Sequence, residues 1–198
     1  MGNDNVDVAV NERPTLHGHM ILSTHTMRPE WEGMDPHHLL RLLEVADADQ
    51  VVDADNIMCV NGLSQLIQSV LWSSIADQNT NMGQPYTASY MYPIYGAVGT
   101  GTTAVTSNDT QLTTEAARAI CASAGVTNAS VSTDPEVVWS FLFGAPGSAL
   151  TIAEAGVFLC ATSTTNNGLL LDHALITPTV AQSTSQLLTL TVVITMGN

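Results

Sequence analysis

Two glutamates are the residues of this sequence with the clearest potential for acid–base chemistry. Glu154 lies in an otherwise apolar segment, residues 150–161, and a buried carboxylate needs a partner or acquires a shifted pKa. In a cleft it could act as a general acid, with Glu115 as the second carboxylate of a glycosidase pair. We favour the structural alternative, in which Glu154 pairs with Arg118 or accepts hydrogen bonds from the backbone amides of residues 99–103.

The segment Gly99-Thr-Gly101-Thr invites comparison with nucleotide-binding loops. A Walker loop requires a lysine, and the sequence contains none. The dinucleotide fingerprint requires a third glycine where this chain has Ala104, and it requires a βαβ unit that the surrounding pattern lacks. We therefore predict a tight turn between strands, in which Gly96, Gly99 and Gly101 permit backbone angles that a side chain would forbid.

Histidines are concentrated near the start of the chain. His17 and His19 would lie on one face of a strand, and His25, His37 and His38 follow within about twenty residues. Such clusters can bind zinc, and paired histidines on a three-fold axis could hold a metal in a trimer. Because the spacing matches no fixed ligand pattern, we expect ordinary surface or interface histidines and no metal or other cofactor.

Aromatic side chains offer a further alternative, a carbohydrate-binding surface. The candidates are Trp31, Tyr86, Tyr90, Tyr92 and Tyr95. Packing in the core or at an interface is the interpretation that we favour. The sequence also has no Gly-x-Ser-x-Gly motif, so it lacks the nucleophile elbow of esterases. We therefore expect a protein that is not an enzyme.

The composition excludes two classes of partner. The formal net charge is −14, with only 4 Lys and Arg residues in 198. Binding to nucleic acid or to anionic lipid requires a basic patch, which four arginines do not supply. The longest apolar run is shorter than the roughly 20 residues of a membrane-spanning helix, so we expect no membrane insertion. The chain has an odd number of cysteines, Cys59, Cys121 and Cys160. We therefore expect free, buried thiols in a protein that folds in a reducing compartment.

Two helices are predicted in the N-terminal half. Asp35-Pro36 is typical of a helix start, with an N-cap residue followed by proline at the first helical position. Leucines at helical spacing continue from there, which predicts a helix over residues 36–46. Apolar residues from Leu63 to Ile75 recur with a period near 3.6, which predicts a second helix over residues 62–76.

Strands dominate the rest of the chain. Alternating apolar and polar residues predict strands at 16–26, 136–143, 150–161 with an interruption at Gly156, and 188–195. Asn166-Asn167-Gly168 is a hairpin signal before a returning strand at 169–176. We expect a mainly β fold: one antiparallel β-sandwich domain, residues 13–198, with the two short helices inserted near 36–46 and 62–76. Residues 1–12 form an N-terminal arm, either mobile or ordered by a neighbouring subunit.

Several short motifs occur in a fixed order along residues 50–196. They are Gly99-Thr-Gly-Thr-Thr-Ala104, Asp109-Thr-Gln-Leu112, Glu115 with Arg118, Thr151-Ile-Ala-Glu-Ala-Gly-Val-Phe158 and Gly168-Leu-Leu-Leu-Asp-His173. In this order the chain resembles a group of small virion structural proteins of tailed bacteriophages and related viruses. The group has "GTGTTAP", "TxLxxExxR", "ITEAGLF" and "GxMLAR" at the corresponding places. This chain has Asp172-His173 where the group has Ala-Arg.

The resemblance implies a β-sandwich and a place in the virion. We therefore expect a non-enzymatic structural protein that assembles as a homo-oligomer on the particle exterior, in the tail, baseplate, fibre or capsid decoration. Its partners would be copies of itself and other virion proteins, assembled in the host cytoplasm. The expected structural residues are Gly99, Gly101, Glu115, Arg118 and Glu154. The alternatives are a fibre module that binds a host-surface glycan and, less favoured, a glycan depolymerase.

Overall fold

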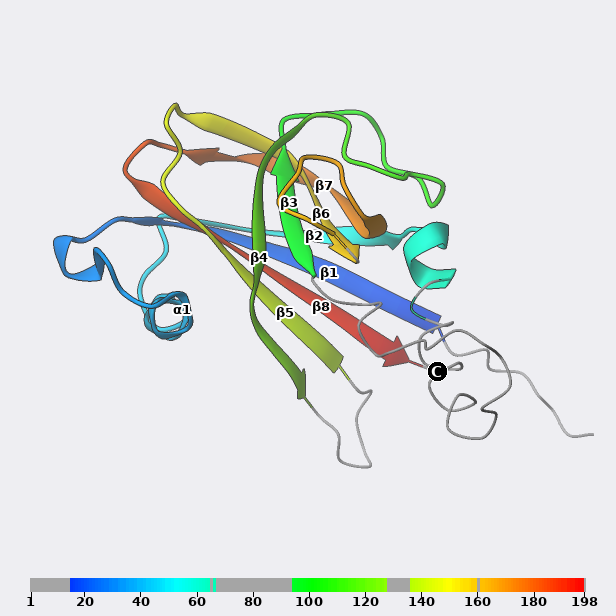
Figure 1. Cartoon of the computed structure of the whole chain (residues 1–198), viewed down its shortest axis with the longest axis horizontal. Coiled ribbons are helices and arrows are strands. Elements are labelled where there is room, and N and C mark those ends of the chain that lie inside the picture. Colours follow the sequence, from blue (N-terminus) through cyan, green and yellow to red (C-terminus); the bar gives the residue numbers. More distant parts are fainter. Residues whose placement is uncertain (1–14, 65, 67–93, 128–135, 160, 198) are drawn as a thin grey trace, which may run out of the picture.

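The protein forms a closed antiparallel β-barrel, so the predicted β-sandwich is wrong. The computed structural model describes residues 15–64, 66, 94–127, 136–159 and 161–197. The strands are β1 (Thr15–Thr26), β2 (Gln50–Met58), β3 (Tyr95–Gly99), β4 (Glu115–Thr127), β5 (Glu136–Phe143), β6 (Leu150–Leu159), β7 (Leu169–Gln182) and β8 (Gln186–Gly197). They follow one another around the barrel as β1-β2-β7-β6-β3-β4-β5-β8 (Figure 1).

Closure depends on two strands that change partner along their length. β2 pairs with β1 over residues 50–55 and with β7 over residues 56–58. β4 pairs with β3 over residues 115–120 and with β5 over residues 121–127. Each of these strands therefore belongs to both sides of the barrel. In a sandwich the two sheets would be separate, whereas here β2 and β4 join the two sides into one closed barrel.

The barrel interior holds the main hydrophobic core. Along β8, Leu188, Leu190, Val192 and Ile194 alternate inward, and Phe141 of β5 is fully buried against them. Each such side chain contributes about 1.5–3 kcal/mol relative to full exposure. This alternation was predicted for β5 and β8, and both strands are confirmed.

The helical segments lie outside the barrel (Figure 1). A 3-10 turn, η1 (Pro29–Trp31), precedes α1 (Pro36–Leu43). The Asp35 side chain accepts hydrogen bonds from the backbone N–H groups of His37 and His38, at 3.0 and 3.2 Å. The predicted N-cap is confirmed, and the helix ends three residues before the predicted end. Leu39 and Leu43 pack with Trp31 and Leu187 in a small second cluster.

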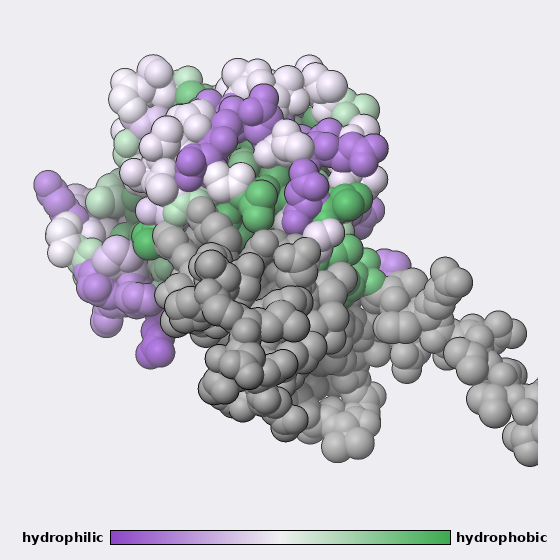
Figure 2. Space-filling model, turned by 45° about the vertical axis from the view of Figure 1, so that its right-hand side comes forward, coloured by the Kyte–Doolittle hydropathy of each residue, from purple (hydrophilic) through white to green (hydrophobic). Residues whose placement is uncertain are grey.

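Residues 60–64 and 66 are helical, which agrees with the beginning of the second predicted helix. Its remainder, residues 67–76, lies outside the described residues, as do the arm, Cys160, Tyr86, Tyr90 and Tyr92. No helix within the described ranges is long and apolar enough to cross a membrane. On the face shown in Figure 2, hydrophobic residues are exposed among hydrophilic ones.

Several predicted boundaries are wrong. β3 continues through Gly96, and β6 continues through Gly156, because neighbouring strands supply ladder partners on both sides. No strand was predicted from Glu115 onward, where β4 begins. β7 was predicted to end at residue 176 and continues to Gln182. The turn before β7 is confirmed, with a positive φ of 51° at Asn166 and 100° at Gly168.

Candidate functional site

The loop between β3 and β4, residues 100–114, is fastened to the barrel by one carboxylate. Glu154 accepts hydrogen bonds from the backbone N–H groups of Gly101 (3.1 Å), Thr113 (2.9 Å) and Thr114 (2.6 Å). Its exposed fraction is 1%. The loop amides thus supply the hydrogen bonds that the Glu154 carboxylate needs, because a buried carboxylate without donors would destabilise the fold.

The alternation of β6 is interrupted just before Glu154. Ile152 pairs with Val180 and Glu154 with Leu175, so the register shifts and the extra residues lie in β7. Ile152 and Ala155 both belong to the core inside the barrel, although an uninterrupted strand would turn them to opposite faces. This irregularity shifts the alternation of β6 by one residue, so Glu154 lies on the outer face of the barrel.

His173 of β7 extends the site to a third element. Its Nε2 lies 3.2 Å from Glu154 Oε2, and its Nδ1 lies 2.8 Å from Asp109 Oδ2. Asp109 also accepts from the Thr106 backbone N–H (2.9 Å) and hydroxyl (2.7 Å). Each ring nitrogen of His173 therefore lies within hydrogen-bond distance of a carboxylate oxygen. We refer to Asp109, His173 and Glu154 together as the polar joint.

The pKa of Asp109 lies below its ordinary value. Desolvation by burial raises this pKa. Hydrogen bonds from the Thr106 backbone and hydroxyl, together with the hydrogen bond and charge of His173, outweigh that effect. Asp109 therefore stays ionised while it holds the loop.

Gly99 and Gly101 are required by close contact with Glu154. A Cβ atom on either glycine would lie 2.5 Å from Glu154 Oε1, and on Gly99 it would also lie 2.5 Å from the Thr114 carbonyl oxygen. Neither glycine has a positive φ. The prediction that these glycines matter for their backbone angles is therefore wrong, because they give the carboxylate access to the loop amides.

Arg118 pairs with Glu115, so the predicted pair of Arg118 with Glu154 is wrong. The Arg118 Nε and Nη2 donate to the two oxygens of Glu115 at 2.8 and 2.9 Å. The side chains are 4% and 1% exposed. The β3–β4 register shifts between Val98 and Gly99, and this bulge places two residues three apart on the same side of β4.

The same arginine holds a second loop, residues 161–168. Its Nη1 donates to the carbonyl oxygens of Thr162 (3.0 Å) and Asn167 (2.6 Å), while Glu115 accepts from the Asn166 backbone N–H (2.7 Å). The guanidinium lies 4.3 Å from the centre of the Phe158 ring. Arg118 is therefore shared between an ion pair, a loop and an aromatic ring.

A separate polar pair lies inside the barrel. Asn56 donates from Nδ2 to Asp172, and the Oδ1 atom of each residue has no hydrogen-bond partner among the described residues. Asp172 is fully buried and lies opposite the core residue Val157. Desolvation raises the pKa of Asp172 to about 8. The only sequence signal for this site was an acidic residue within the apolar run 169–176.

The histidine cluster predicted near the N-terminus does not converge on a metal site in the described part of the chain. No group of three or more His, Cys, Asp or Glu residues there could hold a metal ion. His19 lies 3.8 Å from Asp53 across the β1–β2 pair. His25 is buried, and desolvation lowers its pKa despite the opposing charge of Asp49.

Cys59 is not a reactive thiol. Cys59 is free and fully buried, and desolvation raises its pKa to about 12. Cys121 is also free and is partly buried. A thiol with a raised pKa carries almost no thiolate at neutral pH, and the thiolate is the nucleophile.

The two glutamates are unsuited to act as a glycosidase pair. Both oxygens of Glu154 are occupied by loop amides and His173, and both oxygens of Glu115 are occupied by Arg118. A general acid must be within hydrogen-bond reach of a substrate oxygen, and these contacts fill that space. Of the candidate sugar-binding aromatics that are described, Trp31 is buried and Tyr95 lies beside Arg118.

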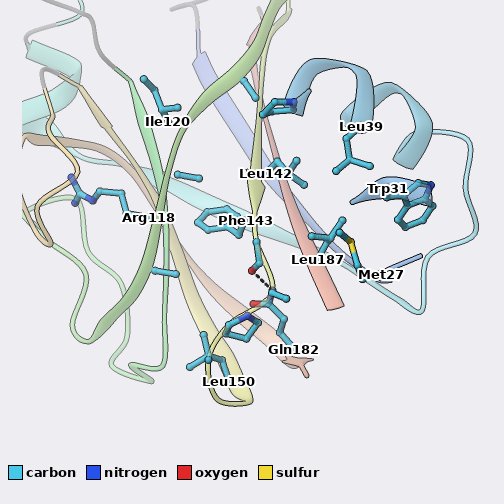
Figure 3. A pocket seen from close by; sticks show the side chains of 18 of the residues that line it. Met27, Trp31, Leu39, Arg118, Ile120, Leu142, Phe143, Leu150, Gln182 and Leu187 are labelled. Carbon is cyan, nitrogen blue, oxygen red and sulfur yellow. Dashed lines mark hydrogen bonds between the residues drawn. The ribbon is translucent and has the colours of Figure 1, made fainter. Parts of the chain in front are cut away.

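A groove of about 760 Å³ lies on another part of the surface, between β4, the segment 27–39 and the loop 144–148 (Figure 3). Its walls are mainly apolar and include Trp31, Leu39, Ile120, Leu142 and Leu187. The Arg118 guanidinium points away from the other labelled side chains. The sequence did not predict this groove, because residues far apart in the chain form it.

Comparison with protein-family models, with curated protein sequences and with solved structures gives no match.

Proposed function

We propose that this protein is a non-enzymatic structural component of a tailed-virus particle, which assembles with copies of itself and with other virion proteins on the particle exterior. The observation that carries the proposal is the convergence of the motif residues. Glu154 accepts a hydrogen bond from the backbone of Gly101, and His173 links Glu154 to Asp109. Glu115 pairs with Arg118. The motifs on which the resemblance rests thus serve the architecture of the barrel.

This convergence favours a structural role over a catalytic one for a chemical reason. Catalysis requires a group that is free to exchange a proton or a bond with a substrate. The charged groups of the polar joint and of the Arg118–Glu115 pair have their hydrogen-bonding capacity filled by the protein itself. Such an arrangement holds loops rigidly on a barrel, which suits a subunit that presents fixed surfaces to its neighbours.

The test is to measure the protein in purified particles from the virus or prophage that encodes it. We expect a fixed copy number by quantitative mass spectrometry and antibody labelling on the particle surface by electron microscopy. Abundant protein in the lysate but none in the particles would refute the proposal. Binding of the isolated full chain to defined glycans on an array would favour the fibre-module alternative, and clearing of a host lawn would favour the depolymerase.

A further inference from the structure

One edge of β4 is open along the apolar groove. β4 pairs with β3 on one side over residues 115–120, but it pairs with β5 on the other side only from Cys121 onward. Within the described residues, the second edge of β4 therefore has no strand partner over 115–120. An unpaired edge presents backbone N–H and C=O groups that readily pair with another strand.

The side chains along this open edge leave room for another backbone. Ala116, Ala117 and Ala119 line the groove beside Ile120, whose exposed fraction is 56%. Alanines allow a close approach, and the apolar walls provide a surface for alternate side chains of an added strand. This combination is the geometry of recognition by strand addition.

The N-terminal arm contains a segment that fits such an edge. Residues 6–10 read Val-Asp-Val-Ala-Val. As an extended strand, this segment would have its three valines on one face and Asp7 and Ala9 on the other. Valine favours the extended conformation. Polar residues flank this short segment on both sides, so its five residues fit within the six residues of the open edge.

The arm of one chain is too short to reach its own groove. Through the strand registers, Thr127 lies at the level of His17, near the start of β1. Arg118 precedes Thr127 by nine residues in β4, a separation of about 30 Å along the strand. Val8 precedes Thr15 by seven residues, and a fully extended chain spans about 24 Å over that length.

We propose that residues 6–10 of a second copy of this chain add as a strand to the open edge of β4 and seat their valines in the groove. This inference rests on the self-association proposed above and gives it a definite site. The added strand completes the pairing of β4 at the corner where the barrel changes partner. The arm of each copy can bind in the groove of another copy.

The test uses full-length chains and light scattering. Val8→Glu places a charge on the apolar face of the arm, and Ile120→Glu places one on the exposed wall of the groove. We expect each variant alone to associate at least about tenfold more weakly than the wild type. Ala9→Glu and Val51→Glu are the matched controls, because each adds the same charge on the other arm face or on an exposed position of β2. Both controls should associate like the wild type.

A mixture of the two weakened variants is the decisive sample. Val8→Glu retains an intact groove and Ile120→Glu retains an intact arm, so one arm–groove contact can form and the mixture should recover dimers. A photo-crosslinker at position 8, in a mixture of ¹⁵N-labelled and unlabelled chains, should link residue 8 to residues 116–122 of a differently labelled chain. Circular dichroism confirms that each variant is folded.

Each other outcome identifies which idea fails. If the wild type associates and both glutamate variants associate equally well, self-association stands and the groove proposal is overturned. Crosslinks confined to one chain would assign the groove to the chain's own arm, and crosslinks to another surface would move the contact elsewhere. A wild type that stays monomeric at all micromolar concentrations and gives no crosslinks would overturn both ideas.

Discussion

Replacing Asp172 with asparagine should change how the stability of this protein depends on pH. Asp172 is fully buried inside the barrel, and its side chain accepts a hydrogen bond from the amide of Asn56. Desolvation raises the pKa of Asp172 from 3.8 to about 8. The asparagine side chain of the variant would keep a similar shape and could still accept a hydrogen bond from Asn56, but it would not ionise.

The direction of the effect follows from proton binding. Between about pH 4 and pH 8 the folded chain keeps the Asp172 proton and the unfolded chain loses it. Stability that is present below the unfolded pKa is therefore lost as the pH rises through the folded pKa. The slope can reach about 1.4 kcal/mol per pH unit, and the full shift of about four units corresponds to about 5–6 kcal/mol. Relaxation around the charge reduces this cost, and we expect about 3 kcal/mol.

The measurement is chemical denaturation of the wild type and of Asp172→Asn from pH 4.5 to pH 9, followed by circular dichroism. We expect similar stabilities near pH 4.5 and a variant that is more stable by about 3 kcal/mol near pH 9. Asp55→Asn removes an exposed carboxylate of β2 and controls for the change in net charge. Taking the difference between the curves cancels titrating groups that the two proteins share.

Parallel stability curves for Asp172→Asn and the wild type would refute this reasoning. They would mean that Asp172 ionises in the fold at little cost, and hence that a donor or water reaches it inside the barrel. A variant that is less stable at every pH would mean that the carboxylate makes contacts that an amide cannot replace.

Three further predictions concern the loops that the charged residues hold. Gly101→Ala should destabilise the fold by about 1–3 kcal/mol because its Cβ would collide with Glu154. Gly144→Ala is the control, because no atom lies within 4 Å of the new Cβ, and it should change the denaturation midpoint little. Glu154→Gln should cost about 3 kcal/mol or more, because the amide NH₂ would face backbone donors; an unchanged midpoint would contradict the hydrogen bonds assigned to it. Arg118→Met and Glu115→Gln should each cost about 3–5 kcal/mol, and a thermodynamic cycle should show strong coupling between them. Additive losses for that pair, or strong coupling of Arg118 with Glu154, would overturn the pairing described.

Local patterns were enough to predict the elements whose environment is the same along their whole length. β5 and β8 have one face toward the core throughout, so their period-two alternation identifies them. α1 begins at an aspartate and a proline whose capping chemistry is contained within four residues. The turn before β7 needs positive φ angles that Asn166 and Gly168 provide. In each case the deciding interactions join residues close in sequence.

β2 and β4 were missed for different reasons. β2 alternates regularly in burial, but the apolar residues Val51 and Ile57 lie on its exposed face, so its polar and apolar residues do not alternate. β4 loses one partner and gains another along its length, so its surroundings change partway. β4 is also rich in alanine, which favours helices in isolation. Its place in the sheet depends on β3 and β5. The change from sandwich to closed barrel follows from these two strands.

The sequence by itself determined that Glu154 needs donors and that the glycines before it allow a tight segment. The tertiary structure decided which donors meet it. His173 and the amides of Thr113 and Thr114 come from segments 19 to 41 residues away. A register irregularity between β6 and β7 sets the direction of Glu154, and a bulge in β4 sets that of Arg118. A bulge reverses the side to which every later residue of a strand points, so the pairing of charged residues depends on a register that only the assembled barrel fixes.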